Sequence, residues 1–406
     1  MARLRRVAQL ACLPCTAILC VDACRPEPTL VSRTVRDSAG IEIIEQPLDD
    51  AAHQTLAPQP ELDLFRAGDP MREFYRVSDA RLFTDGSIAV VNTGTQQVRV
   101  FSRDGHPVGE FGRLGEGPGE FRAPTRVFGL SGDRLLISDP ALNRISVFDR
   151  TGRFLEGGAL PPDARPPLVL GVLDSDRILL RFRGVGYPQG GFQPQFMRYF
   201  IYAWSTGALD SIARVASGTI GHVGRGEPWG RVSSALFDAQ AHGATRAGEV
   251  VLGNGANSEL YFYDPGPVVR RILRWPSSQR PVTAEDLRAY RDAVQAEMPP
   301  DEYRTMMSKQ IDATPVADHV PVFEALMVDR DDRIWVQTFL RPGAERQRWL
   351  VFDLRSATVA VVDLSAAMQL FDALADTVLV VDKDALDAEH VCLYALVASE
   401  AGAVGR

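Results

Sequence analysis

The segment Ser87-Ile-Ala-Val-Val-Asn92 decides how this sequence is interpreted, because five segments of the same kind follow it along the chain. Each holds a short aliphatic run that follows a turn containing Gly, Asp or Ser. The later copies are residues 134–139, 177–182, 249–254, 333–338 and 377–382. Short aliphatic runs between turn residues are typical of strands that are buried on both faces. The repetition therefore predicts an equivalent buried strand in each of six units.

The neighbours of these segments repeat as well. After the first copy, apolar residues recur at 98–101 and 107–111, on either side of Arg103-Asp-Gly105. After the second copy they recur at 145–148 and 154–155, on either side of Arg150-Thr-Gly152. A further apolar segment precedes the copies, for example at 80–83. The repeating unit is therefore predicted to be four antiparallel strands joined by short turns.

One four-stranded unit cannot bury both of its faces, whereas several units stacked face to face around an axis can. We therefore predict an all-β fold, a six-bladed β-propeller of four-stranded antiparallel blades over residues 37–398. The sixth unit lacks an obvious last strand after Ala395. Because Ile41-Glu-Ile-Ile-Glu45 alternates like a strand, we expect this N-terminal strand to complete the last blade and close the ring. Residues 399–406 are expected to form a C-terminal tail.

The first residues are typical of an export signal. Arg3, Arg5 and Arg6 precede a mostly apolar stretch that ends Val21-Asp22-Ala23-Cys24. Residues 1–23 are predicted to be a signal peptide and residues 24–36 a linker. A small residue before a cysteine favours lipidation of Cys24, which gives an exported cell-envelope lipoprotein, facing the outer membrane or the periplasm, whose membrane contact is the lipid anchor alone. Simple secretion after cleavage nearby is the alternative.

Composition excludes several classes of protein. The chain has 406 residues, with 44 basic and 52 acidic side chains and a formal charge of −8, and it lacks a basic stripe, so nucleic acid is not expected as a partner. A Gly-x-Ser-x-Gly elbow, a dinucleotide fingerprint and an HExxH motif are all missing from the sequence. The chain is therefore expected to be a binding protein rather than an enzyme.

Four segments carry a resemblance to a known family. Asn143-Arg-Ile-Ser-Val-Phe-Asp-Arg-Thr-Gly152 resembles an NHL repeat. Segments 37–45, 115–121 and 386–390 are similar to signatures of bacterial six-bladed β-propeller lipoproteins, a largely uncharacterised family, and the resemblance covers roughly residues 34–397. It implies the fold and export. It implies no reaction, so no catalytic residue is carried over.

The long connections are expected on one face of the propeller. They are residues 112–124 and 215–235 between units, and 183–197 and 340–347 within units. A helical insertion is predicted at 276–320, between blades 4 and 5, where Thr283-Ala-Glu-Asp286 has the residues of a helix start and Pro299-Pro300 separates two helices. Elaboration of one face suggests that this face binds a ligand. Candidate ligand-binding residues are Arg122, Tyr187, His222, Arg225, Trp229 and Arg341.

Two functions stay open. The first is a binding or scaffold module for an envelope protein, peptide or glycan on the loop-rich face. The second is a metal-dependent lactonase or lyase with its site at the channel mouth. No cofactor is predicted, but Asn92, Asp139, Asn254 and Asp382 recur at the ends of the buried strands. Turn capping explains them most simply, and a ring of oxygen ligands for Ca²⁺ is the alternative.

Overall fold

The computed structural model describes residues 32–163, 165–184, 191–296 and 302–399. The regular secondary structure of these residues is β-strand, apart from two α-helices and two short 3₁₀ turns. No helix in these ranges is long and apolar enough to cross a membrane. Tyr187, the proposed signal peptide and Cys24 lie outside the described residues.

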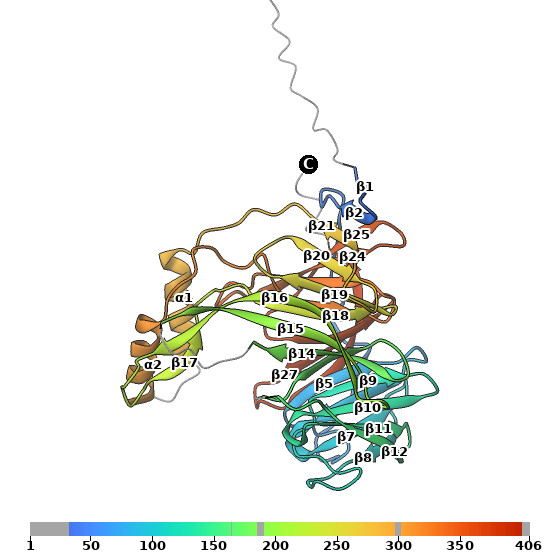
Figure 1. Cartoon of the computed structure of the whole chain (residues 1–406). Coiled ribbons are helices and arrows are strands. Elements are labelled where there is room, and N and C mark those ends of the chain that lie inside the picture. The colour runs from blue at the N-terminus through green and yellow to red at the C-terminus, as the bar shows by residue number, and fades with distance from the viewer. Residues whose placement is uncertain (1–31, 164, 185–190, 297–301, 400–406) are drawn as a thin grey trace, which may run out of the picture. The chain divides into compact units, whose positions relative to one another are not determined.

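Six runs of consecutive antiparallel strands, here called sets 1 to 6, recur along the described chain (Figure 1). Set 1 is β5 (Val77–Leu82), β6 (Ile88–Asn92), β7 (Gln97–Phe101) and β8 (Pro107–Phe111). Set 2 is β9 (Arg126–Leu130), β10 (Arg134–Asp139), β11 (Arg144–Asp149) and β12 (Phe154–Ala159). Set 3 is β13 (Leu168–Val172), β14 (Arg177–Arg183), β15 (Gln193–Ala203), β16 (Ala208–Val223) and β17 (Arg231–Ser234).

Sets 4 to 6 follow the same order. Set 4 is β18 (Ala241–Arg246), β19 (Glu249–Asn254), β20 (Glu259–Tyr263) and β21 (Val269–Arg274). Set 5 is β22 (Phe323–Val328), β23 (Ile334–Thr338), β24 (Arg346–Asp353) and β25 (Thr358–Ser365). Set 6 has three strands of its own, β26 (Gln369–Leu374), β27 (Thr377–Lys383) and β28 (Glu389–Ala398). Sets 3 and 6 therefore differ from the predicted four strands.

The six aliphatic runs of the sequence are confirmed as strands, and each is the second strand of its set. Neighbouring residues of these strands enter two different core clusters, because side chains alternate across a strand. In β10, Leu135 packs with set 1 and Leu136 packs with set 3. Val90 of β6 and Leu379 of β27 share one cluster, so set 6 packs against set 1. Each set thus packs against two others.

The N-terminal strands do not lie where we expected them. β1 (Thr34–Ser38) and β2 (Ile41–Glu45) form a hairpin, and β2 pairs in parallel with β21 of set 4. The prediction that residues 41–45 complete the last blade is therefore wrong. Ile44 is buried in the core between sets 4 and 5, which fixes β2 there. Set 6 is instead completed by β3 (Ala52–Leu56), which pairs with both β25 and β28, and by β4 (Leu62–Asp63).

Set 3 extends well beyond the other sets. Most of residues 215–235, expected as a connection, is strand, because β16 continues to Val223 and pairs with β17. Similarly, β15 begins inside the expected loop 183–197, and β24 begins inside the expected loop 340–347. The long strands reach the helical insertion, formed by α1 (Ala284–Ala296) and α2 (Glu302–Ala313) (Figure 1).

The predicted helix start at Thr283 is confirmed. The Thr283 hydroxyl accepts a hydrogen bond from the Asp286 backbone N–H at 3.2 Å, and the Asp286 carboxylate accepts one from the Thr283 N–H at 2.9 Å. This reciprocal cap satisfies two backbone donors that a helix N-terminus otherwise leaves unpaired. The Arg280 guanidinium beside it holds the pKa of Asp286 well below its usual range.

Candidate functional site

The residues expected to bind a ligand on the loop-rich face lie in three places. His222 is in β16, Arg225 is exposed in the turn that follows, and the Trp229 carbonyl accepts a hydrogen bond from Gln310 of α2 at 2.6 Å. Arg341 pairs with Glu285 of α1 at 2.7 Å. Trp229 and Arg341 thus hold the two helices in place.

Arg122 lies apart from this group, between β8 and β9. Its guanidinium pairs with Glu116 at 2.6 Å, and its backbone N–H donates to Asp139 at 2.7 Å. Tyr187 lies outside the described residues, so its place in a site stays a prediction. The structure therefore does not bring the described candidates together around one cavity.

The polar strand ends are engaged in local hydrogen bonds. Asp139 accepts from the backbone N–H groups of Ala141 and Leu142, which caps the turn after β10. Asn92 accepts from Tyr75, Asn254 accepts from Ala256, and Asp382 accepts from the next backbone N–H, that of Lys383. In the ranges that the structure describes, no group of three or more His, Cys, Asp or Glu side chains could hold a metal ion. A ring of oxygen ligands for Ca²⁺ stays the alternative interpretation of these residues.

A cavity of about 1050 Å³ lies among the first strands of the sets. All six first strands, β5, β9, β13, β18, β22 and β26, contribute residues to its wall. Its charged and titratable lining residues are Arg81, Arg126, Asp174, Arg181, His242, Asp329, Arg330 and Asp332. The volume is close to the upper end of the range for small-molecule sites, and these side chains make the wall strongly polar.

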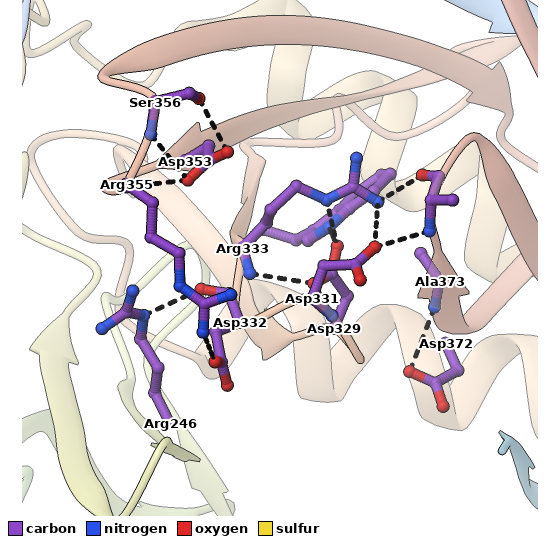
Figure 2. Close-up of polar contacts among 12 residues, drawn as sticks. Arg246, Asp329, Asp331, Asp332, Arg333, Asp353, Arg355, Ser356, Asp372 and Ala373 are labelled. Carbon is purple, nitrogen blue, oxygen red and sulfur yellow. Dashed lines mark hydrogen bonds and ion pairs between the residues drawn. The ribbon is translucent and has the colours of Figure 1, made fainter. Parts of the chain in front are cut away.

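The carboxylates of the cavity wall are each paired with an arginine that does not line it. Asp174 pairs with Arg177 at 2.6 Å. Figure 2 shows the corresponding contacts in set 5, where Arg333 binds Asp329 at 2.6 Å and Arg355 binds Asp332. The Arg246 Nε also donates to the Asp332 carbonyl at 2.8 Å. These acids therefore add little uncompensated negative charge to the cavity.

Two lining arginines have carboxylate partners behind the wall. Arg81 pairs with Asp372 at 3.5 Å, and Arg126 lies 3.8 Å from Asp79. Both carboxylates also bind the first strand of the next set: Asp372 accepts from Leu82 N–H at 3.0 Å, and Asp79 accepts from Val127 N–H at 2.9 Å. Burial raises the pKa of Asp372 to about 6, although Arg81 and Arg330 oppose the rise.

The other two lining arginines lack such partners. Neither Arg181 nor Arg330 forms an ion pair with a carboxylate in the described part of the chain. Burial, and after it the charge of Arg181, lowers the pKa of His242 to about 4, so this imidazole is neutral at pH 7. The wall of the cavity therefore carries more arginines than ion-paired carboxylates, although Arg330 interacts with Asp372 at longer range.

Sequence reasoning missed this cavity. The available signal was the charge inside strands that are otherwise apolar, such as Asp79 and Arg81 in β5 and Asp372 in β26. Charged residues are almost never fully buried unless they are paired, so their presence in an inner strand marks a polar interior. The sequence analysis predicts the ligand-binding residues in the long connections instead.

Comparisons with known proteins give no close relative. No family model matches the chain, and no curated protein matches it. Among solved structures, the chain is similar to a member of the DUF4221 family from Bacteroides vulgatus, with 13% identity, a TM-score of 0.48, and coverage of 84% of this chain and 98% of that one. It is also similar to a calcium-binding protein, regucalcin, from Agrobacterium tumefaciens, with 10% identity, a TM-score of 0.37, and 85% and 96% coverage. For virginiamycin B lyase from Staphylococcus aureus the values are 8%, 0.36, 78% and 95%.

Proposed function

We propose that this chain is a six-bladed β-propeller that acts as an exported binding module and holds an anionic ligand in its central cavity. Sets 1 to 6 are the blades in this proposal. It is supported by the six core clusters, each shared by two sets, and by the cavity that all six first strands line. Blades stacked in a closed series leave their innermost strands around a common axis.

The class of ligand is inferred from the excess of guanidinium groups in the cavity. Four arginines line the wall, whereas its three aspartates are paired elsewhere. A guanidinium in a site of restricted water access binds carboxylate or phosphate groups strongly. The ligand is therefore an acidic small molecule, or the acidic group of a peptide or glycan, within the partner classes expected from the sequence.

Export and lipid anchoring are part of the same proposal and rest on the sequence of residues 1–24. Lipidation attaches the mature N-terminus to a membrane and leaves the propeller outside the cytoplasm. Fractionation of cells that express the whole chain tests this point. The wild type is expected in the membrane fraction and the variant Cys24→Ser in the soluble fraction. Equal distribution of both would contradict the anchor.

Thermal unfolding of the full chain with citrate or inorganic phosphate tests the cavity as the binding place. A ligand at a hundred times its Kd stabilises a protein by about 2.7 kcal/mol, which raises Tm by several degrees. Ser131 is an exposed residue of the cavity wall, so Ser131→Trp is expected to abolish the shift. Thr206→Trp, at an exposed turn outside the wall, is the matched control and is expected to keep it.

Two results would contradict the proposal. One is a wild-type protein that neither citrate, phosphate nor galacturonate stabilises. The other is a Tm shift that survives in Ser131→Trp but disappears in Trp229→Ala, because Trp229 lies in the turn between β16 and β17 and does not line the cavity. The second result would assign the ligand to the loop-rich face.

A further inference from the structure

One arginine of the cavity spans two sets without a carboxylate partner. Arg181 lies in β14 of set 3, and its Nη1 donates to the carbonyl of Ala241 in set 4 at 3.3 Å. The hydroxyl of Tyr199 in β15 also interacts with this side chain. A guanidinium has several more donors in one plane, so Arg181 keeps donors for a group inside the cavity.

His242 lies next to this arginine. It follows Ala241 in β18, lines the same cavity, and packs against Phe323 with ring centroids 5.3 Å apart. Its Nε2 is buried and has no hydrogen-bond partner in the described part of the chain. A buried polar atom without a partner costs free energy. A ligand hydroxyl that binds Nε2 would remove that cost.

The two side chains offer different chemistry to a ligand. The planar fork of Arg181 matches a carboxylate, which it can bind through two parallel hydrogen bonds. The neutral imidazole of His242 carries no charge to attract a second anion, and it can accept from or donate to a hydroxyl. Asp372, the buried carboxylate described above, lies in β26 of set 6 and pairs with Arg81 instead.

We propose that Arg181 and His242 form a subsite for a hydroxylated carboxylate, the chemistry of a sugar acid, with the carboxylate on Arg181 and a neighbouring hydroxyl on His242. The inference rests on the proposed function, because it names the class of anion that the cavity selects. A cavity of about 1050 Å³ accommodates a sugar ring together with its acid group.

Isothermal titration of the full chain with three probes of similar shape tests this subsite. D-galacturonate has the ring, the carboxylate and the hydroxyls. D-galactose lacks the carboxylate, and cyclohexanecarboxylate lacks the hydroxyls. The wild type is expected to bind galacturonate at least tenfold more tightly than either probe, since each probe lacks one of the two groups that the subsite would hydrogen-bond.

Variants assign the two preferences to the two residues. Arg181→Gln is expected to remove the preference for galacturonate over galactose and to leave galactose binding within twofold. His242→Phe keeps a ring against Phe323 and is expected to remove the preference for galacturonate over cyclohexanecarboxylate. Arg183→Gln, in the same strand but outside the cavity wall, is the matched control and is expected to change no affinity more than twofold. Unfolding curves recorded for each variant verify that it is folded.

The outcomes separate this inference from the proposed function. If citrate stabilises the wild type but not Ser131→Trp, while galacturonate binds no more tightly than the two comparison probes, the subsite is overturned and the anion-binding cavity stands. If Arg181→Gln and Arg183→Gln lower galacturonate affinity equally, general charge and not the subsite is responsible. If no anion stabilises the wild type, both proposals fail.

Discussion

At two contacts between neighbouring sets, a lining arginine has different kinds of partner. Where set 6 meets set 1, Arg81 faces the buried carboxylate of Asp372, which also binds two backbone N–H groups. Where set 3 meets set 4, Arg181 donates to the Ala241 carbonyl and interacts with the Tyr199 hydroxyl, and it has no carboxylate ion-pair partner among the described residues. Both arginines line the same cavity. The difference suggests that the first contact serves stability and that the second leaves its charge available to a ligand.

Replacement of each arginine by glutamine tests this contrast, and it is expected to give the largest change in the free energy of unfolding. At pH 7, Arg81→Gln leaves Asp372 buried without its nearest cation and is expected to lower the free energy of unfolding by about 3 kcal/mol. Arg181→Gln removes no ion pair and is expected to cost about 1 kcal/mol or less. Arg126→Gln, at a side chain that is 45% exposed and 3.8 Å from Asp79, is expected to lower the free energy of unfolding by about 1 kcal/mol, because exposed ion pairs contribute little. Urea unfolding of the three variants measures these values, and equal losses for Arg81 and Arg181 would remove the contrast.

A pH series gives the next largest effect. The pKa of Asp372 is raised by burial from 3.8 to about 6, so the folded protein binds this proton more tightly than the unfolded chain does. The free energy of unfolding therefore falls as pH rises from about 4 to 7, and the stabilisation is fully present only at the acidic end of this window. We expect the wild type to lose about 2 kcal/mol over this range relative to Asp372→Asn, which does not titrate. Parallel curves for the two proteins would show that Asp372 keeps an ordinary pKa.

The strands of the fold were predictable wherever local sequence determines them. Runs such as Ser87–Asn92 carry their own signal, since an aliphatic segment between turns is a buried strand whatever its partners. The cap at Thr283 is equally local. The place of residues 41–45 was not predictable, because two different edges could accept a parallel or antiparallel strand and only packing of Ile44 decides between them. β3, with the sequence Ala-His-Gln-Thr-Leu, has too little apolar character to be recognised.

The site was less predictable than the fold. Arg181 and His242 are 61 positions apart, on different sets, and the sequence contains no motif that links them. Trp229 and Arg341 attracted notice because they stand in long segments, but the structure uses them to hold α1 and α2. The alternation of apolar and polar residues along one strand shows which side chains are buried. It does not show which charges meet a partner from another set.

The N-terminal strands also impose an order on folding. β2, β3 and β4 are synthesised early, whereas their partner strands β21, β25 and β28 belong to sets 4, 5 and 6 and are synthesised much later. At ordinary rates of translation, roughly 15–65 s separate the synthesis of β4 from that of β28. Until β21 and β25 are made, β3 and the edge of β2 that β1 does not cover lack these partners, and unpaired edges favour aggregation. We therefore expect the nascent chain to be most prone to aggregation before the later sets are made.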